Sequence, residues 1–373
     1  MSSIDDIPAA DWDRLKADTS PFLRHAFFAA LEHSGCTTAT TGWQPAHLVL
    51  RRGERTVGII PAFRKYHSMG EYVFDWAWAD AYARYDLDYY PKLLMAVPFT
   101  PAQGARLLLE PELREQLTPD DLHGLLNDIA ARLDCHSWHL LFPQAADRPL
   151  LERPDSLHRL GCQFHWINRD YESFDDFLAT LTSRKRKSIR KERRQVAEQG
   201  IEFTHFPGTA LPGHILETFF TFYQATYLKR GQRPYLNLEF FRMLRAKQPE
   251  QMHIVMALKD EQMIAGALFL LGEGTLYGRY WGCLEEYQHL HFETCYYQGI
   301  ELAIARGLHR FDAGAQGEHK LVRGFEPQLT HSWHWVAHRG FTRAIGDFCR
   351  EEAEEVRAYR ESALQALPYR RAN

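Results

Sequence analysis

Hydrophobic and polar positions in the first half of the chain follow two distinct periods. Residues 118–134 carry apolar side chains at helical spacing behind a threonine cap, which predicts an amphipathic helix. Two apolar runs flank the polar segment 51–55, which predicts a β-hairpin over residues 45–67. The predicted elements are, in chain order, a helix at 20–35, this hairpin, a strand at 89–101, the helix at 118–134, and strands at 137–143 and 159–171.

The second half repeats this order of elements. Its predicted elements are helices at 173–181 and 183–194, a strand at 201–206, helices at 215–230 and 237–247, a hairpin at 252–272, a strand at 274–284, a helix at 291–308, strands at 309–314 and 329–338, and a C-terminal helix. Both halves therefore run helix, hairpin, strand, helix, strand. This order indicates an α/β (α+β) fold of two similar units with mixed sheets flanked by helices.

The length of 373 residues also favours two domains, because one hydrophobic core rarely organises so long a chain. We expect the first unit to span residues 1–175 and the second to span residues 176–373. The second unit would carry a basic helix at 183–199 and the C-terminal helix. No low-complexity segment separates the two halves, so we expect them to pack against each other.

Composition and charge narrow the functional classes. The hydrophobic share of 45% and the charged share of 25% are those of an ordinary globular protein. The formal net charge of -4 excludes a polyanion binder that acts through overall charge, so any basic site must be local. The acidic N-terminus and the short apolar runs predict neither a signal peptide nor a membrane span. With six scattered cysteines and no CxxC pair, we expect a cytoplasmic protein with reduced thiols.

A basic run at residues 183–194 is the first candidate functional feature. It holds eight basic residues and one acid, and like charges on one helix repel each other by a few tenths of a kcal/mol per close pair. Bound phosphate would relieve that repulsion, whereas a solvated surface helix is the alternative. The candidate phosphate-binding residues are Arg184, Arg186, Lys187 and Arg190.

Two further segments combine cations with aromatic residues. Residues 225–236 place Arg230 and Arg233 around a glycine and a proline, which fits either a substrate loop or a capped helix end. Near His291 a predicted strand ends and a helix begins. The free backbone N–H groups at the start of that helix suit a carbonyl or phosphate oxygen. The candidate site residues around this helix start are Trp281, His291, Glu293, Tyr297 and Gln298. His289, His291 and Glu293 form only a weak metal pattern, so we expect no metal.

The loop at residues 314–325 is the last candidate and the most concentrated. Two glycines lead into Glu318, His319, Lys320 and Arg323, and a glycine and a phenylalanine follow. A lysine ammonium can stabilise a developing oxyanion, and an arginine can bind phosphate or carboxylate as a fork. A salt-bridged surface loop is the alternative. Loops at strand ends carry ligands in α/β folds, which favours the functional interpretation.

Three segments, residues 183–194, 281–308 and 311–325, resemble the predicted N-acyltransferases related to the Fem peptidyltransferases, within the GNAT superfamily. Residues 74–101 are also typical of that bacterial group. The resemblance implies tandem GNAT-like units and transfer of an acyl group to an amine. In Fem enzymes the donor is an aminoacyl-tRNA and the acceptor is a peptidoglycan precursor. Fem enzymes and this chain share a loop late in the sequence in which a lysine precedes Gly-Phe. This similarity implies that Lys320 stabilises the carbonyl oxygen of the acyl group.

These observations predict an N-acyltransferase with Lys320, Glu293, His291 and His319 as catalytic candidates. The chain lacks the long coiled-coil insertion of many Fem proteins and the pyrophosphate loop of acetyl-CoA users. The co-substrate therefore stays open between acyl-CoA and aminoacyl-tRNA, with no tightly bound cofactor. The acceptor would be a small amine or one that resembles a peptidoglycan precursor. The alternative function is a GNAT-fold binding module without catalysis, which would bind tRNA or another phosphate-bearing ligand.

Overall fold

The computed structural model describes residues 1–16, 19–315 and 317–370. By compactness the chain divides into two units, residues 1–162 with 329–359 and residues 163–328 with 360–373. Residues 329–359 thus group with the first unit, whereas the sequence analysis assigned them to the second. The predicted boundary of GNAT-like domains at residues 175 and 176 stays a prediction.

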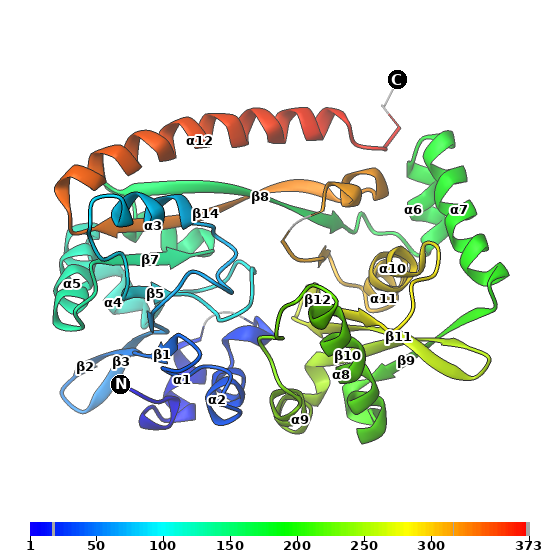
Figure 1. The fold of residues 1–373 in the computed structure, drawn as a ribbon, viewed down its shortest axis with the longest axis horizontal. Helices are drawn as coiled ribbons and strands as arrows, with labels where there is room; N and C mark the ends of the chain where they lie inside the picture. Colours follow the sequence, from blue (N-terminus) through cyan, green and yellow to red (C-terminus); the bar gives the residue numbers. More distant parts are fainter. Residues whose placement is uncertain (17–18, 316, 371–373) are drawn as a thin grey trace. The chain divides into compact units, whose positions relative to one another are not determined.

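The first unit contains a mixed sheet whose strands follow the order β1-β4-β5-β7-β14 (Figure 1). Strands β5 and β7 are parallel, whereas β14 pairs antiparallel with β7. A second, antiparallel sheet has the order β2-β3-β6. The strands are β1 (Trp43–Pro45), β2 (Leu48–Arg52), β3 (Arg55–Ile60), β4 (Phe63–Lys65), β5 (Lys92–Met95), β6 (Leu108–Leu109), β7 (Ser137–Leu141) and β14 (Glu326–Val336). The helices are α1 (Ala9–Leu15), α2 (His25–His33), α3 (Trp76–Ala83), α4 (Pro111–Gln116), α5 (Pro119–Arg132) and most of α12 (Arg339–Gln365).

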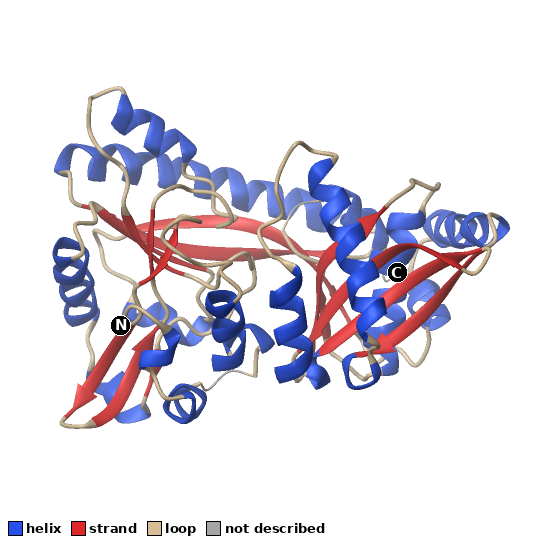
Figure 2. Ribbon diagram, turned by 60° about the horizontal axis from the view of Figure 1, so that its bottom comes forward, coloured by secondary structure: helices blue, strands red, loops and turns tan. Residues whose placement is uncertain are grey.

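The second unit contains a mixed sheet in the order β8-β13-β12-β11-β10-β9. Its strands are β8 (Leu157–Ile167), which begins in the first unit, β9 (Ile201–Pro207), β10 (Met252–Lys259), β11 (Gln262–Leu271), β12 (Thr275–Cys283) and β13 (Arg310–Asp312). Its helices are α6 (Phe174–Thr180), α7 (Ser183–Glu198), α8 (Gly213–Leu228), α9 (Leu238–Lys247), α10 (Leu290–Phe292) and α11 (Gln298–Ala305). Figure 2 shows helices beside the strands within each unit, so the predicted α/β class with mixed sheets is confirmed.

Most predicted elements are present, and their local signals explain them. Thr118 caps α5 in a capping box with Asp121, as the threonine and the acidic first turn predict. The helix expected at 20–35 is divided into a 3₁₀ turn, Pro21–Leu23, and α2, because Arg24 adopts an extended conformation between them. The helix expected at 291–308 is present as α10 and α11, with a π-helix, Glu293–Tyr297, between them.

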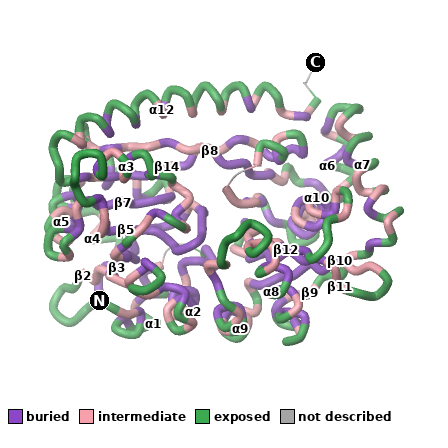
Figure 3. The backbone as a smooth tube through the Cα atoms, in the orientation of Figure 1, coloured by how far each residue is buried: buried purple, intermediate pink, exposed green. Residues whose placement is uncertain are grey.

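The core of the second unit lies on both faces of its central strands. Six of the eight residues of β10 are buried, which Figure 3 shows as a mostly buried strand. Helix α8 packs on β11 and β12, and it approaches β12 closely at Gly282. A Cβ atom at Gly282 would lie 2.0 Å from the carbonyl oxygen of Phe222. Only glycine therefore allows this contact between helix and strand.

Candidate active site in the second unit

Strands β12 and β13 pair over a short distance and then separate. Their described parallel pairing covers Thr275–Tyr277 and Arg310–Asp312. The register between β11 and β12 shifts at Leu268 and Phe269, so Arg279 is the extra residue of a bulge on β12. Beyond Asp312 the chain turns away through Gly314, which has a φ of +83°. The backbone of β12 after Tyr277 therefore borders a gap between strands.

A buried ion pair holds the two strands at the point where they separate. The Arg279 Nη2 atom lies 2.8 Å from Asp312 Oδ2, and both side chains are 3% exposed. Asp312 also accepts a hydrogen bond from the backbone N–H of Gly314. Burial alone would raise the pKa of Asp312, but the Arg279 charge keeps it below its ordinary value. The ion pair thus fixes the start of the loop that follows β13.

A small cavity of about 120 Å³ lies at this gap. It is lined by β11, β12, the helix start and the end of β13: Ala267, Leu268, Phe269, Gly278, Arg279, Tyr280, Trp281, His291, Cys295, Tyr296 and Ala313. Cys295 and Tyr296 belong to the π-helix, a feature that occurs frequently at functional sites. The volume is below the ~300–1,000 Å³ of an ordinary small-ligand pocket.

His291 faces this cavity as a neutral imidazole. Its ring lies 5.2 Å from the Trp281 ring and 6.1 Å from the His319 ring, measured between centroids. Burial, together with the nearby charges of His319 and Arg323, lowers the pKa of His291 to about 4. A neutral imidazole at pH 7 can accept a proton.

Lys320 is buried beneath the loop that follows β13. Its Nζ atom donates hydrogen bonds of 2.8 Å to the carbonyl oxygens of Ala313 and Gly314. The residue is only 2% exposed, and burial lowers the pKa of Lys320 to about 8, although Asp312 opposes that effect. An ammonium group has three donors, so two of them position the cavity wall at Ala313 and one is left.

His319 contacts a second group of the cavity. The Tyr296 hydroxyl lies 2.8 Å from Nε2 of His319. Burial lowers the pKa of His319, with Lys320 and Arg323 adding to the effect, so its neutral ring can accept the Tyr296 proton in a hydrogen bond. Burial also raises the pKa of Tyr296, which keeps the hydroxyl protonated. The loop and the π-helix are therefore joined through polar groups at the cavity.

Arg323 lies in a buried network rather than in a cavity. Its Nε donates to the Tyr297 hydroxyl over 2.9 Å, and its Nη2 donates to Glu192 Oε2 over 2.9 Å. Tyr297 donates to the same Glu192 oxygen, and the Arg323 guanidinium lies 3.5 Å from the centre of the Phe292 ring. Protein groups thus engage the guanidinium in this structure. The expected binding of phosphate by Arg323 and of substrate by Tyr297 stays a prediction.

Glu293 is the first residue of the π-helix, and other side chains bind its carboxylate. Its carboxylate accepts hydrogen bonds from Arg193, with Nη2 to Oε1 at 3.0 Å, and from Gln298 over 2.8 Å. The Gln298 amide oxygen in turn accepts a hydrogen bond from Nε2 of the exposed His205 ring over 2.8 Å. Glu293 is buried, and it is not among the described residues that line the cavity. His291 is therefore better placed than Glu293 to act as a base.

The predicted cationic residues lie on two surfaces of the unit. Arg184, Lys187 and Arg190 are exposed on α7, and Arg186 is half-buried there. Arg190 pairs with Asp175 over 2.7 Å. Arg230 and Arg233 are exposed at the C-terminal end of α8, and the charge of Arg230 contributes to the low pKa of His291. Their roles in phosphate binding stay predictions.

The sequence analysis missed several residues that position this site. They are Glu192, Arg193, Arg279, Tyr296 and Asp312. Glu192 and Arg193 stand within the basic run and were hidden by its overall charge, although a lone acid among eight cations is itself a signal of a specific contact. The other three needed the register of β12 and the π-helix, which no periodicity indicates.

No group of three or more histidine, cysteine, aspartate or glutamate residues is placed to hold a metal ion within the described ranges. The expected absence of a catalytic metal stays a prediction. Within the same ranges, none of the helices combines the length and apolar composition that a bilayer crossing requires.

Comparisons with known proteins bear on the fold. The structure resembles the crystal structure of FemX, with a TM-score of 0.52 and 10% identity, over 91% of this chain and 98% of that chain. It also resembles the C-terminal domain of a putative lysylphosphatidylglycerol synthetase from Agrobacterium fabrum, with a TM-score of 0.50 and 10% identity, over 92% and 95% of the two chains. No curated protein matches the sequence. At these identities the likenesses show the fold alone.

The α/β fold with mixed sheets, as the sequence predicted, is thus shared with FemX. The family model described as peptidoglycan biosynthesis/recognition matches residues 3–371. The chain therefore belongs to the FemAB-like family.

Proposed function

We propose that the protein transfers an acyl or aminoacyl group from an activated donor to an amine, at the cavity between β12 and β13. His291 and Tyr296 line this cavity. His319 and Lys320 are not among its described lining residues, but each bonds to one of them, His319 to Tyr296 and Lys320 to Ala313. This arrangement is the observation that carries the proposal. Each group suits a different step of acyl transfer. The backbone of β12 that borders the opening can pair with an extended donor.

His291 is the proposed general base. The amine attacks the carbonyl in its neutral form, and its nitrogen must then lose a proton before the tetrahedral intermediate collapses to the amide. His291 lines the cavity and is neutral at pH 7, because burial lowers its pKa to about 4. A low pKa makes it a weak base, so it suits the acidic ammonium of the forming tetrahedral intermediate better than a free alkyl ammonium.

Lys320 is the proposed oxyanion donor. As the amine nitrogen bonds to the carbonyl carbon, negative charge develops on the carbonyl oxygen. Two Lys320 donors are bound to the carbonyl oxygens of Ala313 and Gly314, which fix the ammonium group in place. The third donor can then stabilise the oxyanion without reorganisation, an arrangement that is worth ~10²–10³-fold in rate.

Tyr296 is the proposed acid for the leaving group. When the intermediate collapses, the C–O bond of an ester or the C–S bond of a thioester breaks, and the leaving oxygen or sulfur takes a proton. Tyr296 lines the cavity and is protonated at neutral pH. The neutral His319 ring at 2.8 Å orients its hydroxyl, and solvent returns the proton to Tyr296 as His291 releases its own.

The basic helix α7 supports a phosphate-bearing donor, either aminoacyl-tRNA or acyl-CoA. Exposed Arg184, Lys187 and Lys191 have no hydrogen-bond or ion-pair partner among the described residues. Such cations attract a polyanion and release its counterions on binding. Family membership favours an acceptor amine of the peptidoglycan-precursor type.

A transfer assay tests the proposal. Purified protein would be incubated with radiolabelled aminoacyl-tRNA or acyl-CoA, and with amine acceptors that include peptidoglycan precursor peptides. We expect formation of a labelled amide with at least one donor, and loss of most activity in His291→Phe. A matched control is His214→Phe, which changes an exposed histidine of α8. Amide formation that is unchanged by His291→Phe would contradict the assigned base.

The alternative function is a binding module without catalysis. The exposed cations of α7 favour it, because they can bind tRNA whether or not the cavity reacts. Tight binding of tRNA or acyl-CoA with no amide product from either donor would favour this alternative.

A further inference from the structure

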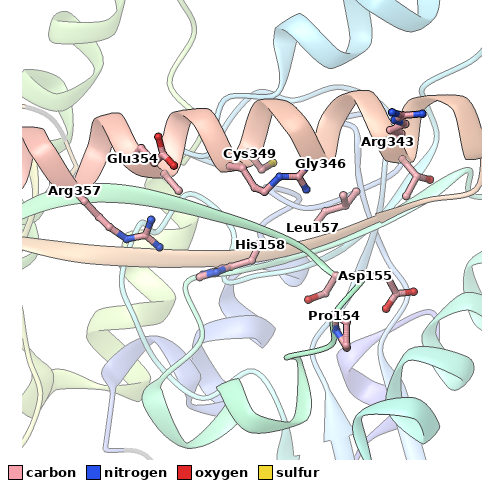
Figure 4. A pocket seen from close by; sticks show the side chains of 13 residues that line it. Pro154, Asp155, Leu157, His158, Arg343, Gly346, Cys349, Glu354 and Arg357 are labelled. Carbon is pink, nitrogen blue, oxygen red and sulfur yellow. The ribbon is translucent and has the colours of Figure 1, made fainter.

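A second and larger cavity lies in the first unit, away from any residue of the proposed reaction. Its volume is about 560 Å³, within the ~300–1,000 Å³ range of small-molecule sites. It lies between α12 and the beginning of β8 (Figure 4). Its lining residues are Pro154, Asp155, Ser156, Leu157, His158, Thr342, Arg343, Gly346, Cys349, Arg350, Ala353, Glu354 and Arg357.

Small residues on α12 leave this space open. Gly346, Cys349 and Ala353 are spaced by three and four residues, so they share the face of α12 that lines the cavity. A helix that packs on a strand ordinarily fills such a face with large apolar side chains. A methyl group added at Gly346 would already lie 3.4 Å from Leu157. These three small side chains therefore form part of the α12 side of the cavity.

A charged clamp keeps the helix beside the strand despite the small residues. Arg159 of β8 forms a forked ion pair with Glu352 of α12, with Nε to Oε2 at 2.5 Å and Nη2 to Oε1 at 2.7 Å. Arg159 also donates to the carbonyl oxygen of Phe74 over 2.6 Å. A bidentate pair of this kind fixes geometry as well as distance. The ion pair therefore joins the two elements that border the cavity.

The charges around the cavity favour an anion. Three arginines line it at seven-residue intervals, Arg343, Arg350 and Arg357. Arg350 pairs with Asp347, whereas Arg343 and Arg357 have no ion-pair or hydrogen-bond partner in the described part of the chain. Of the two lining acids, Asp155 is paired with Arg153 over 3.1 Å. The unpaired lining charges are thus two arginines against Glu354.

A flat and rigid wall completes the cavity near Arg357. The His158 ring is stacked on Trp333 with centroids 4.3 Å apart, and its Nε2 lies 2.9 Å from Nδ1 of His331. Figure 4 shows the Arg357 side chain extending from α12 toward the strands that carry His158, and the Arg357 charge acts on the His158 ring. Burial lowers the pKa of His158 to about 4, and Arg357 adds to the effect, so the ring is neutral at pH 7. Arg357 therefore lies beside an uncharged aromatic surface with no carboxylate partner.

We propose that this cavity is a binding site for a small molecule with carboxylate or phosphate groups on a compact apolar body. Arg357 binds the anionic group, since a guanidinium fork matches carboxylate and phosphate oxygens. Leu157, Cys349 and Ala353 contact the apolar body. The inference is independent of the proposed transfer reaction, because every lining residue belongs to the first unit.

Calorimetric titration of the full chain with citrate and with inorganic pyrophosphate tests the site. The citrate arm probes carboxylate ligands and the pyrophosphate arm probes phosphate ligands. We expect saturable 1:1 binding of at least one probe, weakened about 10-fold or more by Arg357→Gln. Arg339→Gln is the matched control, because Arg339 is an exposed arginine of α12 that does not line the cavity. It should leave the affinity unchanged.

A variant that fills the cavity keeps the test independent of charge. Gly346→Leu places a side chain in the space beside Leu157, and leucine favours a helix interior more than glycine does. We therefore expect a folded protein, checked by its thermal unfolding midpoint, that does not show saturable binding. The proposal is overturned if neither probe binds at millimolar concentration. It is equally overturned if Arg357→Gln and Gly346→Leu bind as tightly as the unmodified chain.

Discussion

The ammonium nitrogen of Lys320 lies 2.8 Å from the carbonyl oxygen of Ala313, a residue that lines the cavity between β12 and β13. This contact joins the 3₁₀ helix Glu318–Arg323 to the end of β13. A buried cation with two backbone acceptors has one direction left for its third donor. The proposed role of Lys320 at the neighbouring cavity uses that remaining donor.

The pH dependence of transfer tests the charge on Lys320. Burial lowers the pKa of Lys320 to about 8, so the ammonium form disappears as the pH rises through that value. We expect kcat to fall on the alkaline side with an apparent pKa near 8. Lys320→Arg keeps its positive charge throughout the pH range of the assay. Its residual activity should therefore lack this decrease at alkaline pH. An unchanged decrease in Lys320→Arg would assign it to another group.

The acid stability of the protein tests the burial of His291. Its pKa is about 4 in the folded chain and 6.5 in an unfolded one. The unfolded state then binds more protons, so the free energy of unfolding falls as the pH decreases from about 6.5 toward 4. In His291→Phe this part of the pH dependence should disappear. Urea unfolding between pH 7 and pH 4 measures it, and an equally steep loss of stability in the variant would contradict the assignment.

Arg193 should contribute strongly to stability, unlike its neighbours on α7. Its guanidinium contacts both Glu293 and Glu301, and Glu293 is 3% exposed. Arg193→Leu would leave a buried carboxylate unpaired, so we expect a loss of about 3–5 kcal/mol in the free energy of unfolding. Chemical denaturation measures this loss.

Two further variants serve as controls for that measurement. Arg194→Leu changes an arginine whose side chain is 67% exposed, and it should alter stability by no more than about 0.5 kcal/mol. Adding Glu293→Gln to Arg193→Leu should recover part of the loss, because the amide needs no counter-charge. Equal losses of unfolding free energy in Arg193→Leu and Arg194→Leu would show that the buried ion pair contributes no more to stability than an exposed arginine does.

The basic helix should bind phosphate-bearing donors in a salt-dependent way. The triple variant Arg184→Gln, Arg186→Gln, Lys187→Gln should weaken binding of tRNA or acyl-CoA. The slope of log K against log salt should decrease by about 1 for each phosphate that the variant no longer neutralises. Its fold should be intact, because the buried residues of α7 are Ile189 and Val196.

A second triple variant is the control for the basic helix. It replaces the exposed Arg51, Arg84 and Lys247 by glutamine, which removes the same number of positive charges elsewhere on the surface. Equal donor affinities of the two triple variants would make α7 an ordinary solvated surface.

The sequence predicted the elements of both halves because their signals are local. Caps, turn residues and apolar periods identify α5, the hairpin β2–β3 and the hairpin β10–β11 without tertiary information. The same pattern could not predict that β14 pairs with β7 in the first unit. Strand pairing over nearly two hundred residues depends on tertiary packing, which alternation along a strand does not specify.

The candidate site was predictable in part, for a similar reason. His291, His319 and Lys320 stand out by residue type, and the structure brings them to one region. Arg323 stands out equally, yet its guanidinium contacts Glu192 and Tyr297. Glu192, the single acid in the basic run, lies beside Arg323 only in the folded chain. Neither the spacing nor the composition of the sequence indicates this contact.

The central claim is that Lys320 acts in catalysis rather than in ligand binding. The most direct test measures turnover and donor affinity side by side for Lys320→Ala, with the exposed Lys247→Ala as the matched control. We predict a loss of ~10²–10³-fold in turnover, with donor affinity nearly unchanged, for Lys320→Ala alone. Turnover equal to that of the unmodified chain would contradict the account, and so would a variant that binds donor more weakly in proportion to its decrease in activity.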